Sequence, residues 1–492
     1  MSQEVRVRFA PSPTGPFHIG GRAFGGFTPS TSALFNYLVA KHNHGKFVVR
    51  IEDTDRKRST SESEENIKEA LKWLGITWDE GIDVGGPDGP YRQTERLGIY
   101  QKYTEKLLAE GKAYYCFCTP EELEAEKQAQ LAKGETPVYS GKCADLPKET
   151  VEQYLKEGRP HVIRIKTPKN ETIELDDLVR GHVSFDSNNV GDFVIVKSDG
   201  IPVYNYCVVL DDALMHITHV IRAEEHLSNT PRQLVIYKAL GFEAPQFAHV
   251  SLILGADKKK MSKRHGATSV QQYRDMGYLP DALVNFLALL GWTPEGDQEI
   301  FSRDELIEQF TLDRVAKNPA VFDIEKLNWI NFHYMKQLDE DQLYAVCLPH
   351  LQKAGYASEN PDKKEAAWLK AICAAMREHV QYGAQIVDAA KVFFTDDYAP
   401  ENEETAAVLK EETAPSVLKM FRDELAALDD VTPDTVQPLF KKIQKGLKVK
   451  GKFVYMPIRV AVTGVMHGPD LNVIVALMGR DKVLARLDET LA

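Results

Sequence analysis

Three features that would narrow the choice of protein class are scarce or missing in this 492-residue chain. No window holds the run of about 18 apolar residues that a membrane-spanning helix needs, so we do not expect a membrane protein. The chain has only six cysteines, too few for the disulfide framework of a secreted protein. The opening "MSQEVRVRFA" alternates charged and apolar residues and lacks the apolar core of a signal peptide. We therefore expect a cytoplasmic protein.

Positive charge is also in deficit, with 60 Lys and Arg against 72 Asp and Glu and a net charge of −12. This balance argues against non-specific binding of nucleic acids, but it allows a polyanion to be held by local basic patches. One such patch is "DKKKMSKRHG", where cations dominate Lys258 to Arg264. A solvated surface loop is the ordinary explanation for a run of lysines, so other motifs must decide its role.

The order of secondary-structure patterns predicts several domains, because the chain is too long for one hydrophobic core. Alternating residues at 5–9 and the run "KFVVRI" indicate strands, and amphipathic patterns at Glu62–Leu74 and Arg92–Leu108 indicate helices. Short strands and turns follow from Tyr114 to Tyr204, and beyond residue 330 the pattern is helical. The predicted fold is a Rossmann-like, doubly wound parallel α/β sheet, split by an α+β insertion and followed by an all-helical region.

The stretch "RFAPSPTGPFHIGG" carries the first candidate site. A strand ends at Arg8, a proline-rich loop follows, and His18, Gly20 and Gly21 come next. Small residues allow the backbone to approach a nucleotide closely, and an imidazole adds a donor for phosphate oxygens. Taken alone, this short motif is more often a plain turn.

Together, the motifs "PSPTG", "HIGG" and "KMSKR" resemble the two signature sequences of class I aminoacyl-tRNA synthetases. With "RIEDTD" and "VIRAEEHLSNTP" in the same order, the chain is similar to the glutamyl-tRNA synthetase family in its bacterial form. The resemblance runs from about Val5 to about residue 292 and resumes at "KGKFVYMPIRVAVTGVMHGPDL". It implies a ligase that uses ATP to form glutamyl-adenylate and transfers glutamate to the 3′ end of tRNA(Glu) for protein synthesis.

The resemblance assigns the lysine-rich loop to ATP, which arrives with Mg²⁺. Cations that close on the phosphates stabilise the negative charge that gathers there in the transition state. The implied catalytic residues are His18, Gly21, Lys260, Lys263 and Arg264, and the implied ATP-binding residues are His18, Gly20, Gly21 and Lys263. Asp53 is interpreted first as structure at a strand end, with contact to metal-bound water as the alternative.

Selection of glutamate requires a cation, because an arginine holds a carboxylate through two parallel charge-assisted hydrogen bonds that an amide cannot match. The resemblance places this role on Arg8 and Arg222, with Tyr204 beside them, and gives Glu52 the substrate's ammonium group. A surface salt bridge for Arg8 and an internal ion pair for Arg222 remain alternatives. The implied pocket consists of Arg8, Ala10, Ser12, Glu52, Tyr204 and Arg222.

A cysteine cluster suggests a second site. Cys116, Cys118 and Cys143 supply three thiolates, and tetrahedral zinc is typically held by such ligands with one further donor. In the family some members bind zinc here with a histidine in the fourth position, where this chain has Asp145. A zinc-free remnant and plain reduced cysteines remain open.

One departure from the family pattern lies beside "HIGG". The segment Arg22–Ser32 separates Gly21 from Ala33, where the family has only about three residues before the next helix. Pro29 opposes a helix, and Ser30, Thr31 or Ser32 could cap a later start. We expect a tolerated bulge. The alternative is a non-catalytic or impaired tRNA-binding variant of a synthetase.

Near the C-terminus, Lys441–Arg459 combines lysines with Phe453 and Tyr455, a mixture suited to phosphates and unstacked bases. The resemblance implies that this helical part reads the anticodon, and a solvated basic face is the alternative. Glutaminyl-tRNA synthetases usually append β-barrels instead, and the short paralogue that modifies a tRNA base lacks this region.

We therefore expect a monomer that binds L-glutamate and tRNA(Glu), with tRNA(Gln) open as a second substrate and no membrane partner. The expected domains are the first half of the catalytic domain at 1–112, a connective acceptor-binding insertion at 113–203, the second half of the catalytic domain at 204–256, the KMSKR loop and stem-contact domain at 257–330, and the anticodon-binding region at 331–492.

Overall fold

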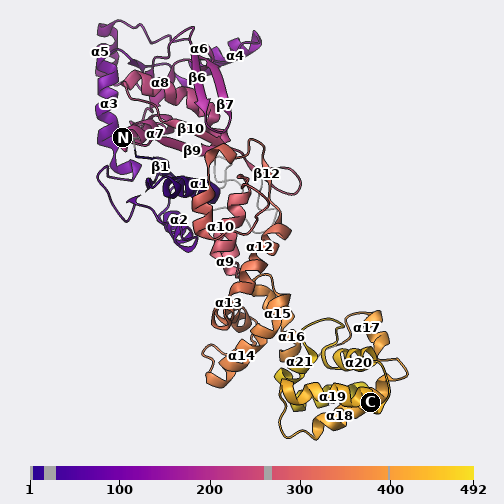
Figure 1. The fold of residues 1–492 in the computed structure, drawn as a ribbon. Coiled ribbons are helices and arrows are strands. Elements are labelled where there is room, and N and C mark those ends of the chain that lie inside the picture. The colour runs from indigo at the N-terminus through magenta and orange to yellow at the C-terminus, as the bar shows by residue number, and fades with distance from the viewer. Residues whose placement is uncertain (1–3, 16–28, 260–268, 397–398) are drawn as a thin grey trace. The chain divides into compact units, whose positions relative to one another are not determined.

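The computed structural model describes residues 4–15, 29–259, 269–396 and 399–492 (Figure 1). The chain divides into two compact units. The first contains Met1–Tyr273 and Pro280–Ile324, and the second contains Arg274–Leu279 and Glu325–Ala492.

A seven-stranded sheet forms the centre of the first unit, in the order β3-β2-β1-β9-β10-β6-β7. Neighbouring strands are parallel except for the last pair, β6 and β7. The strands are β1 (Arg6–Phe9), β2 (Lys46–Val49), β3 (Glu80–Gly81), β6 (Thr172–Asp177), β7 (Gly181–Asp186), β9 (His219–Ala223) and β10 (Gln246–Val250).

The central strands of this sheet are buried, and most of β2 is a short apolar run. Val7 in β1 and Phe47, Val48 and Val49 in β2 are fully buried, as expected for parallel strands that helices cover on both faces. Helix α1 (Pro29–His42) packs against β1 and β9. The other helices around this sheet are α2 (Ser61–Trp73), α3 (Leu97–Ala109), α7 (Tyr204–Leu214) and α8 (Thr230–Leu240). The predicted doubly wound α/β core is confirmed.

Strand β1 occupies the switch point of the sheet, because its neighbours β2 and β9 lie on opposite sides of it. In open α/β sheets, ligands bind outside the carboxyl ends of the strands at such a point. Here those ends lead into Ala10 after β1, Glu52 after β2 and Glu224 after β9. The topology therefore positions a crevice where the sequence motifs begin.

The predicted insertion at 113–203 contributes to two sheets. Strands β4 (Ala113–Cys116), β5 (Val162–Ile165) and β8 (Phe193–Val196) form a separate antiparallel sheet. Strands β6 and β7 instead extend the main sheet, where Asp177 is paired with Phe247 of β10. Helices α4 (Pro120–Ala132), α5 (Lys148–Lys156) and α6 (Ser187–Val190) complete this stretch. Part of the insertion thus belongs to the core.

The rest of the first unit follows β10. Strand β11 (Ile253–Leu254) pairs with β12 (Ala320–Val321), and α10 (Pro280–Leu289) and α11 (Arg303–Gln309) pack against α1. Helix α9 (Val270–Asp275) lies at the boundary between the two units.

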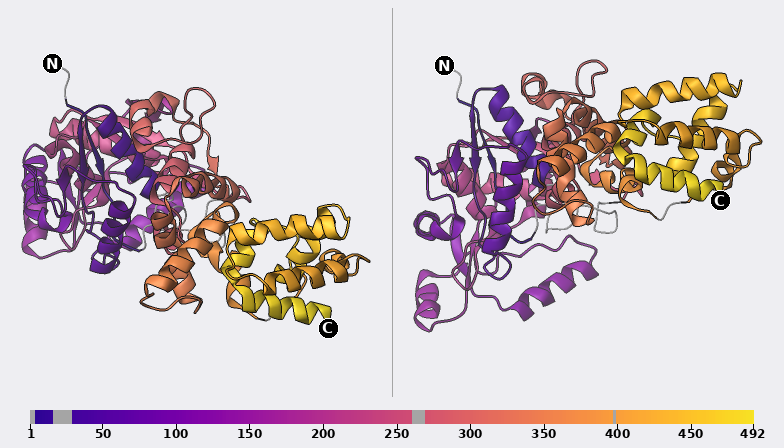
Figure 2. Two further views of the ribbon diagram at one scale, coloured as in Figure 1. Left: turned by 60° about the horizontal axis from the view of Figure 1, so that its bottom comes forward. Right: turned by 90° about the horizontal axis from the view of Figure 1, so that it is seen from below.

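In the second unit, every regular element among the described residues is a helix (Figure 2). This confirms the predicted all-helical C-terminal region. Its core joins residues such as Leu343, Phe421 and Ile458. The α-helices are α12 (Ile324–Gln337), α13 (Glu340–Lys353), α14 (Lys363–Met376), α15 (Ile386–Ala389), α16 (Lys391–Phe394), α17 (Glu403–Val408), α18 (Ala414–Ala426), α19 (Pro433–Gly446), α20 (Lys452–Thr463), α21 (Leu471–Met478) and α22 (Arg480–Leu491). Across the described chain, no helix is both long and apolar enough to cross a membrane.

Helix α1 starts within the segment that departs from the family pattern. It begins at Pro29, so Ser30, Thr31 and Ser32, which the sequence suggested as caps of a later start, lie inside the helix, and that expectation was wrong. Proline is tolerated in the first turn of a helix, where its missing N–H has no intrahelical partner. Residues 22–28 lie outside the described part of the chain, and so does the predicted bulge.

The turn between α1 and β2 generates a test of the sheet packing. A Cβ atom added at Gly45 would lie 2.1 Å from the carbonyl oxygen of Val5, so we expect Gly45→Ala to lower the free energy of unfolding by about 1–3 kcal/mol. Gly98 in α3 has nothing within 4 Å of the same position, and Gly98→Ala is the matched control, expected to be neutral or slightly stabilising. The measurement is the midpoint of thermal unfolding, and equal midpoints for both variants would contradict the packing described here.

Candidate active site

Four of the predicted pocket residues meet at the carboxyl ends of the central strands. Arg8 lies on β1, Glu52 follows β2, Arg222 lies on β9, and Tyr204 begins α7. Burial raises the pKa of Tyr204, and the charges of Arg222, Glu52 and Arg8 also act on that pKa. The four side chains therefore share one electrostatic environment, although they come from distant parts of the sequence.

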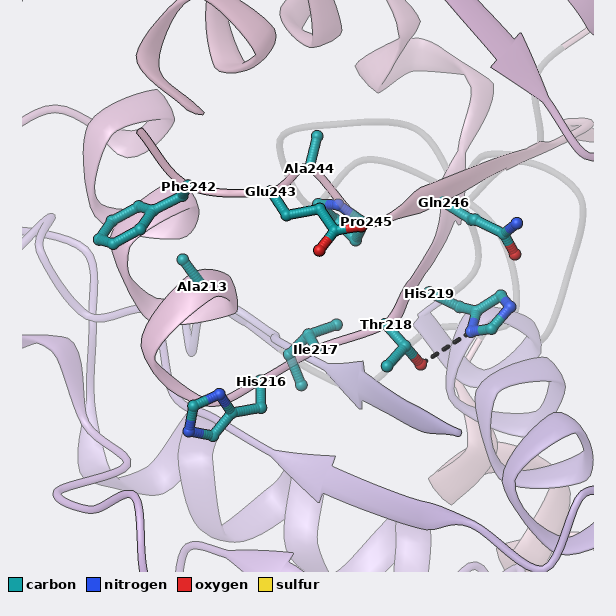
Figure 3. Close-up of a pocket in the computed structure, with 10 residues that line it drawn as sticks. All are labelled: Ala213, His216, Ile217, Thr218, His219, Phe242, Glu243, Ala244, Pro245 and Gln246. Atoms are coloured by element: carbon teal, nitrogen blue, oxygen red, sulfur yellow. Dashed lines mark hydrogen bonds between the residues drawn. The ribbon is translucent and has the colours of Figure 1, made fainter. Parts of the chain in front are cut away.

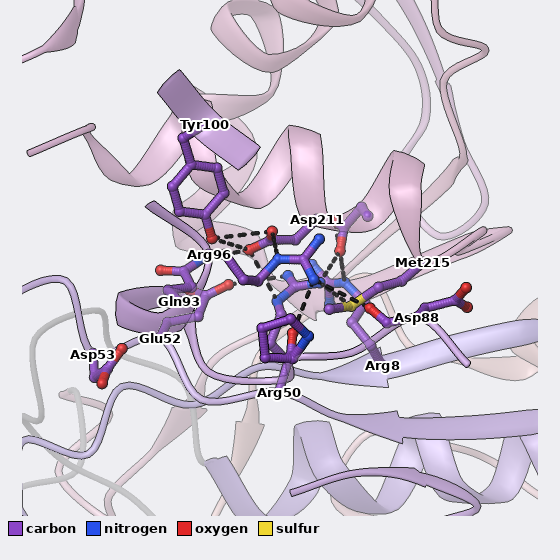
Figure 4. A network of polar contacts seen from close by, with 12 residues as sticks. Arg8, Arg50, Glu52, Asp53, Asp88, Gln93, Arg96, Tyr100, Asp211 and Met215 are labelled. Atoms are coloured by element: carbon purple, nitrogen blue, oxygen red, sulfur yellow. Dashed lines mark hydrogen bonds and ion pairs between the residues drawn. The ribbon is translucent and has the colours of Figure 1, made fainter. Parts of the chain in front are cut away.

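A network of buried charges surrounds Arg50, whose side chain is fully buried (Figure 4). Its guanidinium lies 3.1 Å from an oxygen of Glu52 and 2.9 Å from Asp212 of α7. Asp212 also accepts a hydrogen bond of 3.1 Å from Nε of Arg8. Buried charges are tolerated when they are paired and hydrogen-bonded, so this network holds Arg8 and Glu52 in place.

Asp211, the neighbour of Asp212 on α7, anchors a second part of this network. Its carboxylate accepts hydrogen bonds from Nε of Arg96 at 2.6 Å, from the hydroxyl of Tyr100 at 2.9 Å and from Nε2 of Gln93 at 2.9 Å. These bonds tie α7 to the start of α3, which fixes the helix that carries Asp212 and Tyr204.

Two of the acids beside Arg50, Glu52 and Asp212, are in different electrostatic states. Burial raises the pKa of Glu52 to about 7, even though Arg50 and Arg8 act in the opposite direction. Burial has the same effect on Asp212, but there the charges of Arg8 and Arg50 prevail and lower its pKa. Glu52 is therefore the incompletely compensated acid of the pocket, and an added cation would stabilise its ionised form.

Arg222 has no carboxylate partner among the described residues. Its Nε donates to Nε2 of His249 at 3.1 Å, and its Nη2 donates to the hydroxyl of Thr230 at 2.9 Å. The neighbouring Glu224 pairs with Arg180 instead. The internal ion pair that the sequence left open is therefore absent from the described structure.

The remaining nitrogen of the Arg222 guanidinium, Nη1, is unpaired among the described residues. This nitrogen is buried and forms the remaining edge of the guanidinium. Burial lowers the pKa of Arg222, which reflects the cost of a cation without a nearby anion. A buried donor without a partner is unfavourable by a few kcal/mol, so this edge is suited to an anionic ligand.

The loop after β1 supplies the other two predicted pocket residues. Ala10 is half-buried and Ser12 is exposed. The backbone oxygen of Pro11 accepts a hydrogen bond of 3.0 Å from the N–H of Glu52, so this loop runs beside the acid of the pocket. The six predicted nucleotide-site residues lie outside the described part of the chain: His18, Gly20, Gly21, Lys260, Lys263 and Arg264.

Asp53 has the structural role that was its first interpretation. Its carboxylate accepts hydrogen bonds from the backbone N–H of Thr94 at 2.9 Å and from the Thr94 hydroxyl at 2.6 Å. These bonds join the end of β2 to the turn before α3.

The three predicted thiol ligands form a compact cluster. The sulfur atoms of Cys116, Cys118 and Cys143 all lie within 4.8 Å of one another. The hydroxyl of Tyr139 is 3.4 Å from the Cys116 sulfur and 3.5 Å from the Cys118 sulfur. Asp145 is not part of the cluster, since its side chain is 97% exposed and lies 3.8 Å from Lys166.

The basic segment near the C-terminus spans the end of α19 and much of α20. Phe453 is exposed, whereas Tyr455 packs on Phe440 with 4.8 Å between ring centroids. Arg459 is held by the backbone oxygen of Pro469 at 2.8 Å. Of the two predicted aromatics, Phe453 is therefore the one exposed on the surface.

A separate cavity of about 420 Å³ lies at the amino ends of β9 and β10 (Figure 3). Thr218 and His219 line it and are joined by a hydrogen bond of 2.8 Å. Because ligands of parallel sheets bind at the carboxyl ends of strands, this cavity is not part of the site described above.

Sequence reasoning missed the buried network that supports the pocket: Arg50, Arg96, Asp211 and Asp212, together with Asp177 and His249 behind Arg222. A usable signal was present, because "FVVRI" and "VVLDDAL" place charges inside apolar runs. Charged residues are seldom buried without partners, so such positions predict partners elsewhere in the chain.

Comparisons with known proteins agree with this geometry. Residues 4–329 match the family described as tRNA synthetases class I (E and Q), catalytic domain, and residues 342–491 match an anticodon binding domain. A glutamate–tRNA ligase of Heliobacterium modesticaldum is 57% identical over 99% of this chain and 96% of that protein. A glutamate–tRNA ligase of Carboxydothermus hydrogenoformans is 56% identical over 96% of this chain and 97% of that protein.

A solved structure is similar over the same extent. The crystal structure of a glutamate tRNA ligase from Elizabethkingia meningosepticum in complex with its amino acid superposes with a TM-score of 0.88, at 34% identity over 99% of both chains. Similarity at this level over the full length does not favour the alternative of an impaired variant. The chain belongs to the glutamate–tRNA ligases, within the class I tRNA synthetases whose catalytic domain it carries.

Proposed function

We propose that this protein joins L-glutamate to the 3′ end of tRNA(Glu) at the expense of ATP, as a cytoplasmic monomer. Two observations in one crevice carry the proposal. The guanidinium of Arg222 is buried and lacks a hydrogen-bond partner at Nη1 among the described residues, and the negative charge of Glu52 is only partly compensated by its neighbours. An amino acid with an acidic side chain supplies the two charges that this crevice lacks.

In the proposed complex, the side-chain carboxylate of glutamate accepts hydrogen bonds from Arg222 and Arg8, and its ammonium group lies against Glu52. Tyr204 lies beside them. Glutamine is rejected because its neutral amide leaves the positive charge of Arg222 buried without an anion, and its NH₂ group would face another donor.

Activation then proceeds without a general base. An oxygen of the glutamate α-carboxylate attacks the α-phosphorus of ATP in line, the bond to the β,γ-diphosphate breaks, and pyrophosphate leaves with the bonding electron pair. The 2′-hydroxyl of the terminal adenosine next attacks the acyl carbon of the adenylate, and AMP leaves. We assign stabilisation of the phosphates to His18, Lys260, Lys263 and Arg264, with Mg²⁺ supplied along with ATP.

The three predicted RNA contacts belong to the same proposal. We assign acceptor-end binding to the insertion at 113–203, stem contacts to 257–330 and anticodon reading to 331–492. In the last region, an exposed aromatic side chain among lysines can stack on an unpaired base, and Phe453 is the residue with that exposure.

The first test is ATP–pyrophosphate exchange with glutamate, carried out with tRNA(Glu), with tRNA(Gln) and with neither. We expect exchange that depends on glutamate and requires tRNA(Glu). Exchange that also occurs with tRNA(Gln) would extend the substrate range. No exchange, with tRNA binding retained, would contradict the proposed activity.

The raised pKa of Glu52 predicts a pH dependence. The acid is largely neutral below its pKa of about 7, and only the ionised form attracts the substrate's ammonium group, so kcat/KM for glutamate should rise from about pH 6 to about pH 8. Glu52→Gln is the control, since it should lower kcat/KM and remove this rise. A flat profile for the unaltered enzyme would contradict the role given to Glu52.

We also propose that the thiols of Cys116, Cys118 and Cys143 hold a structural zinc ion. The compact cluster fits tetrahedral zinc with soft ligands. The hydroxyl of Tyr139 lies 3.4 Å from the Cys116 sulfur and 3.5 Å from the Cys118 sulfur. Bound zinc would cross-link β4 to the segment around Cys143. Asp145 is too exposed to serve as a fourth ligand without a change in the segment that carries it.

Metal analysis of purified protein tests the zinc site. We expect stoichiometric zinc in the unaltered protein, loss of zinc and a lower unfolding temperature in Cys143→Ser, and retention of zinc in Asp145→Ala. Loss of zinc from the Asp145 variant would mean that this segment rearranges on binding. Absence of zinc from the unaltered protein would refute the site.

A further inference from the structure

Behind Arg222, a buried row of three side chains runs across the neighbouring strands β6, β10 and β9 to the pocket. Oδ2 of Asp177 on β6 lies 2.6 Å from Nδ1 of His249 on β10. Nε2 of the same imidazole accepts from Nε of Arg222 at 3.1 Å. The side chains of Asp177 and His249 are completely buried, and Arg222 is 5% exposed.

The hydrogen-bond chemistry allows one tautomer for His249. A guanidinium can only donate, so Nε2 must be the unprotonated nitrogen that accepts from Arg222. The proton then resides on Nδ1 and is donated to the carboxylate of Asp177. The imidazole is thus neutral, and burial, which lowers the pKa of His249, is consistent with this state.

Thr230 holds the second edge of the guanidinium. Its hydroxyl accepts from Nη2 of Arg222 at 2.9 Å and lies 3.2 Å from the backbone oxygen of His226, to which it can donate. Two of the three nitrogens of Arg222 therefore have fixed acceptors, and among the described residues Nη1 has no partner. The rotation of the planar group is set by His249 and Thr230.

We propose that His249, oriented by Asp177, is a positioning residue for amino-acid selection: it fixes the plane of the Arg222 guanidinium so that Nη1 faces the substrate carboxylate. The inference rests on the proposed function, because it assigns Arg222 to the side chain of glutamate. His249 itself does not touch the substrate in this scheme. It acts only through Arg222.

The neutrality of the imidazole is part of the proposed role. A carboxylate in direct contact with Arg222 would orient the guanidinium equally well, but it would also neutralise the charge that the substrate must find. The imidazole of His249 orients the guanidinium through a single acceptor nitrogen and leaves the positive charge of Arg222 uncompensated. The negative charge of Asp177 is held one side chain farther away, where it fixes the tautomer.

A matched pair of substitutions separates this role from a structural one. His249→Asn keeps an N–H near the place of Nδ1 for Asp177 but is too short to present an acceptor to Arg222. His249→Gln reaches that place with its amide oxygen and restores the acceptor. We measure KM for glutamate, KM for ATP, the discrimination between glutamate and glutamine, and the unfolding temperature.

We expect His249→Asn to raise KM for glutamate about tenfold or more, the usual loss for a hydrogen bond to a charged group, and to weaken discrimination against glutamine. KM for ATP should stay unchanged, and His249→Gln should stay close to the unaltered enzyme. An unchanged KM for glutamate in His249→Asn, or an equal rise in both folded variants, would overturn the proposal.

If the histidine variants do not fold, Thr230→Val and Thr230→Ser provide the second measurement. The first removes the acceptor of Nη2 and should raise KM for glutamate, and the second keeps the hydroxyl and should not. Equal KM values for glutamate in Thr230→Val and Thr230→Ser would overturn the idea that the guanidinium must be held on both edges. An unaltered enzyme without glutamate-dependent exchange would instead refute the proposed function, which separates the two failures.

Discussion

The buried positive charge of Arg50 is the constraint on which the site depends. A guanidinium removed from water requires anionic partners, and Glu52, Asp211 and Asp212 provide them from β2 and α7. Because Asp212 also binds Arg8, one ionic cluster ties β1, β2 and α7 together at the switch point of the sheet. The positions of the Arg8 and Glu52 side chains follow from this cluster.

The pocket that results is incompletely neutralised at two places. Glu52 shares its arginines with stronger competitors and remains a weak acid, with a pKa near 7. Arg222 is oriented by an imidazole and a hydroxyl, neither of which carries charge. An amino acid with an acidic side chain offers an ammonium group to Glu52 and a carboxylate to Arg222. Selectivity in this site is therefore a matter of charges that the fold leaves unsatisfied and holds in fixed positions.

The fold class could be predicted from the strand and helix patterns. Arg8, Glu52 and Arg222, which the resemblance assigned to the pocket, lie on or just after central strands of the sheet. The supporting cluster could not be predicted, since its bonds join residues far apart in the chain, such as Arg8 and Asp212. Spacing also suggested Asp145 as a metal ligand, but spacing carries no information on the direction of a side chain. The pairing of β6 with β10 is likewise set by tertiary contacts.

That strand pairing has a consequence for the modularity of the enzyme. Residues 113–203 look like a cassette inserted between two halves of a nucleotide-binding core, yet their strand β6 delivers Asp177 to the back of the amino-acid pocket. Exchanging residues 113–203 between relatives would therefore also exchange the carboxylate that holds His249. One continuous stretch of chain therefore forms both the separate sheet of β4, β5 and β8 and a part of the wall behind Arg222.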